Sequence, residues 1–231
     1  MMELTETVLR AYVPESDYFD ARSADAAEVP EADLPHYLYG LARLAFLRQG
    51  LFSAHAACVG TDAGYVLLFG HSGDGKTTVS LRLVREHGYR LYAGNKTVVE
   101  FADGAVAAVA GTKTISELTS TGRRFFRLEE KEYAPRSAMP IRAMVKVKLN
   151  DGVAELKRLA PLSALHALYP FFLDAVNADI IVGKGTRVLP GDPPDGVRER
   201  LATELLQVFE TVPAYALAGS LAYVVSSIQE I

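Results

Sequence analysis

Hydrophobic and polar residues in the first third of the chain follow two different spacings. Residues 32–49 place apolar side chains three and four positions apart, which predicts a helix that packs against a sheet. Residues 54–59 and 65–69 are short apolar runs on either side of the turn sequence GTDAG, which predicts a hairpin. Before residue 30 the chain is polar and rich in alanine, apart from a short strand predicted at 8–13.

The rest of the chain predicts short strands, a flap and further helices. A helix is expected from Thr77 until Gly88, because glycine commonly ends helices. Residues 112–140 are polar, basic and interrupted, which predicts a mobile flap or a long loop. Further strands are predicted at 89–93, 97–101, 105–110 and 141–149, and further helices at 160–172 and 195–211.

This succession of elements favours an α/β fold with a mixed sheet. Short strands joined by tight turns, such as Ala102-Asp103-Gly104, are not typical of a wholly parallel sheet. The chain has 231 residues, of which 49% are hydrophobic and 23% charged, as in ordinary globular proteins. We therefore expect an N-terminal lead-in at 1–30 and one domain at 31–231.

Charge is distributed unevenly along the chain. The formal net charge of −4 argues against general nucleic-acid binding. Residues 121–148 carry eight basic and three acidic side chains, which is +5 and leaves −9 for the remainder. This basic segment either faces a phosphate or an acidic substrate, or forms a solvated face with charge pairs along the chain.

The cysteine usage and the chain ends indicate a compartment. Cys58 is the single cysteine and lies in an apolar alternation, so we expect a core residue and no internal disulfide. The chain starts without signal-peptide features, and no apolar run approaches the ~18 residues of a membrane span. A cytoplasmic protein that does not enter a membrane is therefore expected. No histidine or cysteine spacing is typical of a zinc site.

One glycine-rich stretch carries a recognisable chemistry. Residues 70–77, GHSGDGKT, fit the pattern G-x-x-x-x-G-K-[ST] between an apolar run and a predicted helix. In this pattern backbone amides surround phosphate, Lys76 reaches the terminal phosphates and the Thr77 hydroxyl ligates magnesium. The alternative interpretation is that Gly73 and Gly75 only form an ordinary turn. The expected nucleotide contacts are Ser72, Gly73, Asp74, Gly75, Lys76, Thr77 and Thr78, although the side chains of His71 and Asp74 occupy variable positions.

Around this stretch the sequence resembles the HPr kinase/phosphorylase family and its smaller kinase relatives. The stretches that carry the likeness are SAHAACVG, YVLLFGHSGDGKTT and HGYRLYAGNKTVVEF. His55 matches a family histidine on the strand before the loop, and Gly88-Tyr89-Arg90-Leu91 matches a later glycine followed by Arg-Leu. The likeness extends over about residues 33–225. It implies a P-loop in a mixed sheet, the nucleotide-binding core shared with phosphoenolpyruvate carboxykinases, and ATP with Mg²⁺ as cofactors.

The sequence departs from this family at one point. Where the family has two aspartates, one a general base and one a metal partner, this chain has Gly94-Asn95. Neither residue accepts a proton at neutral pH, although the Asn95 oxygen can support a metal. His55 is the first candidate for a replacement base, and a hydrogen-bonded core histidine is the alternative.

These features predict an ATP-dependent kinase that phosphorylates a hydroxyl of a small molecule or peptide. The alternative is a nucleotide-binding regulator or scaffold that kept the loop and lost the base. A switch-type ATPase or GTPase is disfavoured, because no clear apolar strand ending in Asp follows the loop. Lys113, Arg123 and Arg124 are candidate contacts to phosphates or substrate, and Lys76 is expected to be exposed in the loop. Larger relatives assemble as rings, so a homo-oligomer is also considered.

Overall fold

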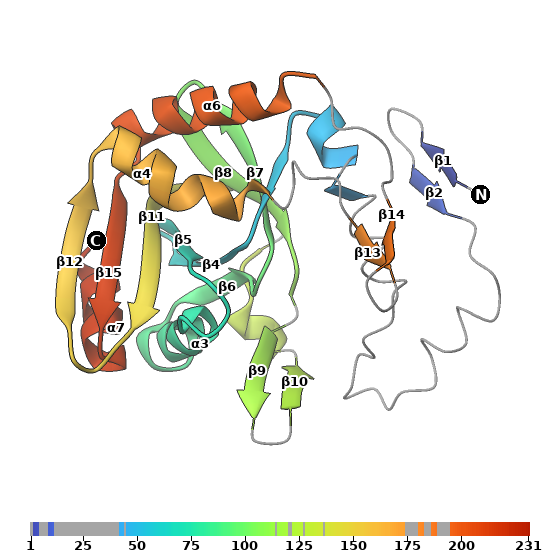
Figure 1. Cartoon of the computed structure of the whole chain (residues 1–231). Helices are drawn as coiled ribbons and strands as arrows, with labels where there is room; N and C mark the ends of the chain where they lie inside the picture. Colours follow the sequence, from blue (N-terminus) through green and yellow to red (C-terminus); the bar gives the residue numbers. More distant parts are fainter. Residues whose placement is uncertain are drawn as a thin grey trace.

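The computed structural model describes most of the chain after residue 41 and two short stretches before it. The described residues are 2–4, 9–11, 42–43, 45–113, 115–119, 122–126, 128–135, 137–173, 180–182, 186–188 and 195–231. They form an α/β structure in which helices lie against both faces of a curled, mixed sheet (Figure 1). The predicted α/β class and mixed sheet are thereby confirmed.

The sheet has nine strands in the described part of the chain. Its main path runs β3 (Phe52–Ala54), β7 (Thr97–Ala102), β8 (Ala105–Gly111), β11 (Met139–Leu149), β5 (Gly64–Phe69), β4 (Ala56–Thr61) and β6 (Arg90–Ala93). In addition, β15 (Ala214–Gly219) pairs with β11, and β12 (Ala154–Leu159) pairs with β15.

The centre of the sheet consists of parallel strands whose carboxyl ends meet at one edge. β5 pairs with β11 in parallel, with Phe69 beside Lys146. β11 pairs with β15 in parallel, with Leu149 beside Gly219. Every residue of β5 is buried, as expected for a strand covered on both faces. We call the edge where these three strands end the loop edge, because the loop at residues 70–75 leaves from it.

The sheet curls because β11 changes partners along its length. It pairs with β8 at Met139 and Pro140, and with β5 from Ile141 onward. The ends of β6 and β8 also approach each other closely. A Cβ atom at Gly111 would lie 2.4 Å from the Cβ of Ala93, so glycine is needed there. The curl therefore brings the edge strand β6 round to the end of β8, an interior strand of the same sheet.

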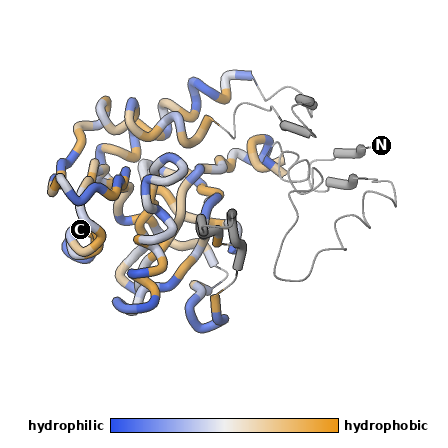
Figure 2. The backbone as a smooth tube through the Cα atoms, turned by 60° about the horizontal axis from the view of Figure 1, so that its bottom comes forward, coloured by the Kyte–Doolittle hydropathy of each residue, from blue (hydrophilic) through white to orange (hydrophobic). Residues whose placement is uncertain are grey.

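Two hydrophobic clusters occupy the two faces of the sheet. One includes Phe69, Phe172 and Leu201, and the other includes Leu68 and Leu83, all of them fully buried. The helices that contribute to the first cluster are α4 (Pro161–Leu168) and α6 (Val197–Thr211), and those of the second are α3 (Lys76–His87) and α7 (Leu221–Glu230). The helices across the top of Figure 2 alternate between hydrophobic and hydrophilic colours, as amphipathic helices on a core do.

The predicted flap at 112–140 contains regular structure. It holds an antiparallel hairpin of β9 (Ile115–Thr119) and β10 (Gly122–Phe126), the short helix η1 (Glu130–Glu132) and the start of β11. Figure 1 shows the hairpin projecting from the body beside α3. The expectation of a long loop is wrong here, because strand pairing supplies hydrogen bonds to this polar segment. The mobility of the segment stays a prediction.

Most of the other predicted elements are confirmed, with shifted ends. The predicted hairpin is β4 and β5, and Gly88 ends α3 with a left-handed φ of 71°. The helix predicted at 160–172 is α4 followed by the short helix η2 (Tyr169–Phe171). Strands β12 and β15 and helix α7 were not predicted.

The amino-terminal predictions lie largely outside the described residues. Residues 42–43 and 45–48, from the helix predicted at 32–49, are helical. The predicted division between residues 30 and 31 lies outside the described part of the chain, as does most of the lead-in. Two small antiparallel pairs complete the structure: β1 (Met2–Leu4) with β2 (Leu9–Ala11), and β13 (Ile180–Val182) with β14 (Thr186–Val188).

In the described part of the chain, no helix is both long enough and apolar enough to cross a membrane.

Replacing Leu201 by alanine tests the core under α6. Leu201 is fully buried, so Leu201→Ala is expected to lower the free energy of unfolding by about 2–5 kcal/mol. Leu162→Ala is the matched control, because Leu162 is 62% exposed and its loss should cost less than about 0.5 kcal/mol. Urea unfolding measures both values. Equal effects of the two substitutions would contradict the assigned core.

Candidate functional site

The loop at residues 70–75 is held in a shape that requires glycine. Gly73 and Gly75 have φ values of 91° and 98°, in the left-handed region that other residues rarely adopt. A Cβ at Gly75 would also lie 2.4 Å from Cδ1 of Leu149, the last residue of β11. The backbone conformation and the close contact with β11 therefore both explain why glycine occupies position 75, the second fixed glycine of the pattern.

Hydrogen bonds inside the loop and to β11 fix its path. The Asp74 carboxylate accepts the backbone N–H of His71 at 2.6 Å. The Leu149 N–H donates to the Asp74 carbonyl at 3.0 Å. A Cβ at Gly70 would lie 3.0 Å from the Val147 carbonyl oxygen, so β11 runs directly beside the loop. Sequence reasoning assigned Asp74 no side-chain role, although an aspartate bonding a nearby backbone N–H is a common turn device.

Lys76 is folded back onto the loop rather than exposed. Its side chain is only 7% exposed, and its ammonium group donates to the carbonyl oxygens of Gly70 and, at 3.0 Å, His71. The expectation of an exposed lysine is therefore wrong. Two loop carbonyls attract the positive charge, and this places the charge against the same loop whose shape the glycines set.

Helix α3 begins directly after the loop without a side-chain cap. Its N-cap is Gly75, and no acidic side chain lies in its first turn. The first-turn amides, including those of Thr77 and Thr78, have no acceptor within the helix and contribute positive potential. Thr77 is partly buried and Thr78 exposed. The loop edge thus carries a lysine and a helix N-terminus that both favour an anion.

His55 lies beside the loop, in a bend and not on a strand as predicted. The bend separates β3, which pairs with β7, from β4, which pairs with β5. Ala56 pairs with Phe69, so His55 directly precedes the residue that faces the last residue before the loop. Its backbone N–H donates to the Phe171 carbonyl at 2.8 Å. The side chain is partly buried, which keeps both the base and the core interpretations physically reasonable.

Asn95 lies at the same edge in the bend between β6 and β7. The flanking residues are tied down: Gly94 N–H donates to the Thr112 carbonyl at 2.8 Å, and Lys96 N–H to the Thr112 hydroxyl at 3.2 Å. The Thr97 hydroxyl donates to the Ala56 carbonyl at 2.8 Å, which joins this segment to the start of β4. The fold therefore brings the neighbourhoods of His55, Asn95 and the loop to one edge.

Lys113 has partners away from the loop. Its ammonium group lies 4.5 Å from the centre of the Tyr133 ring and 3.7 Å from the Glu130 carboxylate. The Tyr133 hydroxyl in turn donates to the Lys113 carbonyl at 2.8 Å. These contacts hold Lys113 against η1 and Tyr133, and its expected contact to phosphates or substrate stays a prediction. Arg123 and Arg124 are on β10, and their side chains lie outside the described residues.

An aromatic and basic neighbourhood beside the loop was missed at the level of sequence. The His71 ring lies 5.1 Å from the Phe171 ring, and the Lys146 ammonium lies 5.9 Å from the same ring. Phe171 belongs to η2. The helical pattern at 160–172 did not indicate that this residue lies beside the loop. Apolar and basic residues alternate in the strand predicted at 141–149. This alternation places Lys146 and Lys148 on the face of β11 opposite to Val145 and Val147.

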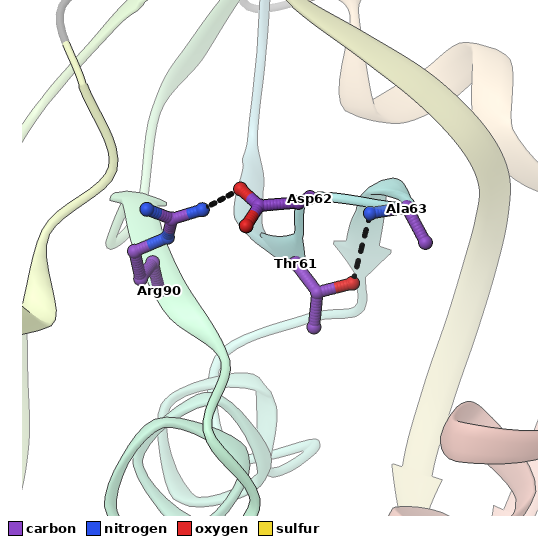
Figure 3. A network of polar contacts seen from close by, with 4 residues as sticks. All are labelled: Thr61, Asp62, Ala63 and Arg90. Carbon is purple, nitrogen blue, oxygen red and sulfur yellow. Dashed lines mark hydrogen bonds and ion pairs between the residues drawn. The ribbon is translucent and has the colours of Figure 1, made fainter.

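A separate hollow of about 430 Å³ lies at the opposite end of the β4–β5 hairpin. It is lined in part by Asp62 and Arg90, which form an ion pair, and by Thr61, whose hydroxyl accepts the Ala63 N–H at 3.2 Å (Figure 3). Thr61 pairs with Gly64 at the start of β5, a full strand length away from the loop. The hollow is therefore distinct from the loop edge.

Two further findings concern the Cys58 thiol and possible metal sites. Cys58 is fully buried, as predicted, and burial raises the pKa of its thiol, so this sulfur stays protonated. Within the residues that the structure describes, no group of three His, Cys, Asp or Glu side chains gathers into a possible metal site.

Comparisons with known proteins add little to this geometry. No family model and no curated protein matches the chain. Among solved structures, it is similar to the HPr(Ser) kinase/phosphatase from Coxiella burnetii, with 10% sequence identity and a TM-score of 0.41. That match covers 77% of this chain and 95% of the other. A likeness of this strength carries no argument about function, so the site has to be interpreted from its own residues.

Replacing Gly75 by alanine tests the geometry of the loop. The added Cβ meets Leu149 and strains a left-handed residue, so Gly75→Ala should weaken MgATP binding at least tenfold, as measured by calorimetry. Gly73→Ala is the control, since its Cβ meets nothing within 4 Å and only the strain applies. The double variant Gly75→Ala/Leu149→Ala should regain part of the affinity. Unchanged affinity in Gly75→Ala would show that the loop does not need this shape.

Proposed function

We propose that the chain binds a nucleoside triphosphate at residues 70–78 and transfers its terminal phosphoryl group to a hydroxyl acceptor. The observation that carries the proposal is the loop itself. Left-handed glycines, the N-terminus of α3 and the Lys76 ammonium all lie at one edge of the sheet, and each favours bound phosphate. ATP is the preferred nucleotide because the sequence resembles kinases that use it.

The loop residues have separate roles in this proposal. Lys76 exchanges its two carbonyl partners for phosphate oxygens, and this places a full positive charge on the group being transferred. The amides of residues 73–78 hold the remaining phosphate oxygens. Positioning and charge stabilisation supply most of the rate enhancement in phosphoryl transfer, so these contacts matter more than a strong base.

Magnesium fits this site with few protein ligands. The Thr77 hydroxyl and the Asn95 amide oxygen are hard, neutral donors of the kind that Mg²⁺ accepts. Kinase-type magnesium sites use one or two protein ligands, and substrate phosphates and water complete the shell. Because Gly94-Asn95 brings no carboxylate, most of the negative charge around the metal has to come from the nucleotide.

His55 is the proposed proton acceptor. It directly precedes Ala56, whose partner Phe69 is the last residue before the loop that would hold the phosphates. A histidine can take the proton from an acceptor hydroxyl at neutral pH, which Gly94 and Asn95 cannot do. The carbonyl of Phe171 holds the His55 backbone, so the ring starts from a fixed point at the loop edge.

A specific observation also favours a second candidate function. The absence of carboxylates at Gly94-Asn95 is the feature expected of a regulator that binds nucleotide and does not turn it over. The two candidates differ in one measurable outcome. A regulator binds MgATP tightly and releases no ADP with any acceptor of a broad panel, whereas a kinase releases ADP when one acceptor is added.

Removing the Lys76 charge tests the phosphate-binding part of the proposal. Lys76→Ala should weaken MgATP binding at least tenfold, because a charge-assisted contact to phosphate is lost. Lys76→Met keeps most of the buried stem and should show the same loss with less effect on the melting temperature. Lys131→Ala is the control, since Lys131 is 80% exposed and lies away from the loop. Unchanged affinity in both Lys76 variants would refute phosphate binding here.

Replacing His55 tests its proposed role as base. His55→Asn should lower kcat about a hundredfold on an acceptor that stimulates ADP release, with MgATP affinity unchanged. Thermal unfolding of the same variant separates catalysis from packing. Near-normal turnover rules out His55 as the base, and a lower melting temperature with intact turnover makes it a core residue.

A further inference from the structure

Three lysines share one face of the sheet next to the loop. In the paired strands β11 and β15, Lys146 lies beside Ala216 and Lys148 beside Ala218. On the other side of β15, Lys157 of β12 also lies beside Ala216. Residues in register across a sheet point to the same face. The three lysines therefore surround two alanines, and we call this surface the lysine face.

The lysine face is open where the rest of the same sheet face is covered. Ala214, at the start of β15, is 2% exposed and belongs to the hydrophobic cluster to which α4 contributes. Ala216 and Ala218, further along β15, are partly exposed. Lys148 and Lys157 are exposed. Figure 1 shows α4 crossing only the upper ends of β11, β15 and β12. The methyl groups of the alanines leave room for a ligand between the lysine stems.

This surface is continuous with the loop edge. Lys148 lies between Val147, whose carbonyl oxygen abuts Gly70, and Leu149, whose N–H donates to Asp74. Lys146 lies beside Phe69, the residue just before the loop, and its ammonium group contacts the Phe171 ring. A molecule bound on the lysine face would therefore be a neighbour of the phosphate proposed to lie in the loop.

The described residues around the lysine face neutralise only part of its charge. Glu155 of β12 lies beside Ala218, on the opposite side of β15 from Lys148. Three lysines and this one carboxylate give the face a net charge of +2. Among the described residues, none of the three lysines forms an ion pair. Their Cα atoms are about 7–12 Å apart by strand geometry, which long lysine stems can bridge to a single anionic group.

We propose that the lysine face binds a carboxylate or phosphate group of the acceptor and so selects acidic hydroxyl compounds. This inference rests on the proposed kinase function and names the class of its acceptor. The lysines draw the acidic group to one side of the loop, and the acceptor hydroxyl then lies toward the terminal phosphate. A neutral alcohol gains nothing from the lysine face and is a poor acceptor.

NMR signals of the lysine side chains test anion binding to the lysine face directly, and the experiment does not require the acceptor to be known. The full chain is labelled with ¹³C at lysine Cε, and the signals of Lys146, Lys148 and Lys157 are assigned with single Lys→Gln variants. The probes are D-glycerate, glycerol 3-phosphate and glycerol, each added with and without Mg²⁺ and a non-hydrolysable ATP analogue. The three signals should shift saturably with glycerate, glycerol 3-phosphate or both, and not with glycerol. The two anions distinguish a carboxylate from a phosphate site.

A charge-removing variant and a matched control complete the test. Lys148→Gln/Lys157→Gln should weaken anion binding at least tenfold and leave the affinity for the ATP analogue unchanged. Lys131→Gln, on an exposed lysine elsewhere, should change neither. The proposal is overturned if neither anion shifts the three signals, or if glycerol shifts them equally. It is also overturned if the double variant weakens nucleotide binding, because the lysines then belong to the nucleotide site.

Failure of the lysine face and failure of the kinase proposal give different results. If the ATP analogue does not bind the unmodified protein, the kinase proposal fails, and the titrations without nucleotide still report on the lysine face. If the analogue binds and no anion does, only the acceptor class proposed here is wrong.

Discussion

The contact between the end of β11 and the glycine loop is the constraint on which the rest of the site depends. β11 pairs in parallel with β5 until Phe69, and its last residue then donates a hydrogen bond to the Asp74 carbonyl. Its Leu149 side chain also occupies the space that a side chain at Gly75 would need. One strand thus shapes the loop from the side and sets where α3 begins. The same strand places Lys146 and Lys148 along that loop.

The sequence allowed the loop and its flanking elements to be predicted because they are local. Strand, glycines and helix follow one another within residues 65–88, and each has its own pattern. The strand pairing places the bends that contain His55 and Asn95 at the same edge as the loop, and the roles of the two residues there stay predictions. The predicted exposure of Lys76 was wrong because its side chain folds back onto the loop carbonyls. Residue types alone do not indicate this contact.

Long-range pairings were the part that sequence patterns could not supply. β12 reads as a run of charged residues, and only its pairing with β15 shows that it is a strand. Phe171 lies within the helix predicted at 160–172, but only the folded structure shows that its ring lies beside the His71 ring. The lysine face has the same origin. Its three lysines come from two strands that a third strand separates, so no short motif could indicate it.

The site combines several positive groups with neutral residues at Gly94-Asn95. Lys76, the start of α3 and the lysine face all favour anions, while Gly94-Asn95 supplies neutral groups. In the proposals above, this edge holds two acidic molecules side by side, and they supply the charge balance around the metal. Nucleotide binding is therefore the central claim, and both the kinase and the regulator interpretations depend on it.

Calorimetric titration with adenosine, AMP, ADP and ATP in the presence of Mg²⁺ tests that claim most directly. If the loop holds phosphates, adenosine and AMP bind weakly, and affinity rises at least tenfold when the second phosphate is added, because loop amides and Lys76 then gain their partners. Equal affinities for adenosine and ATP, or no binding by any of the four compounds, would contradict the account.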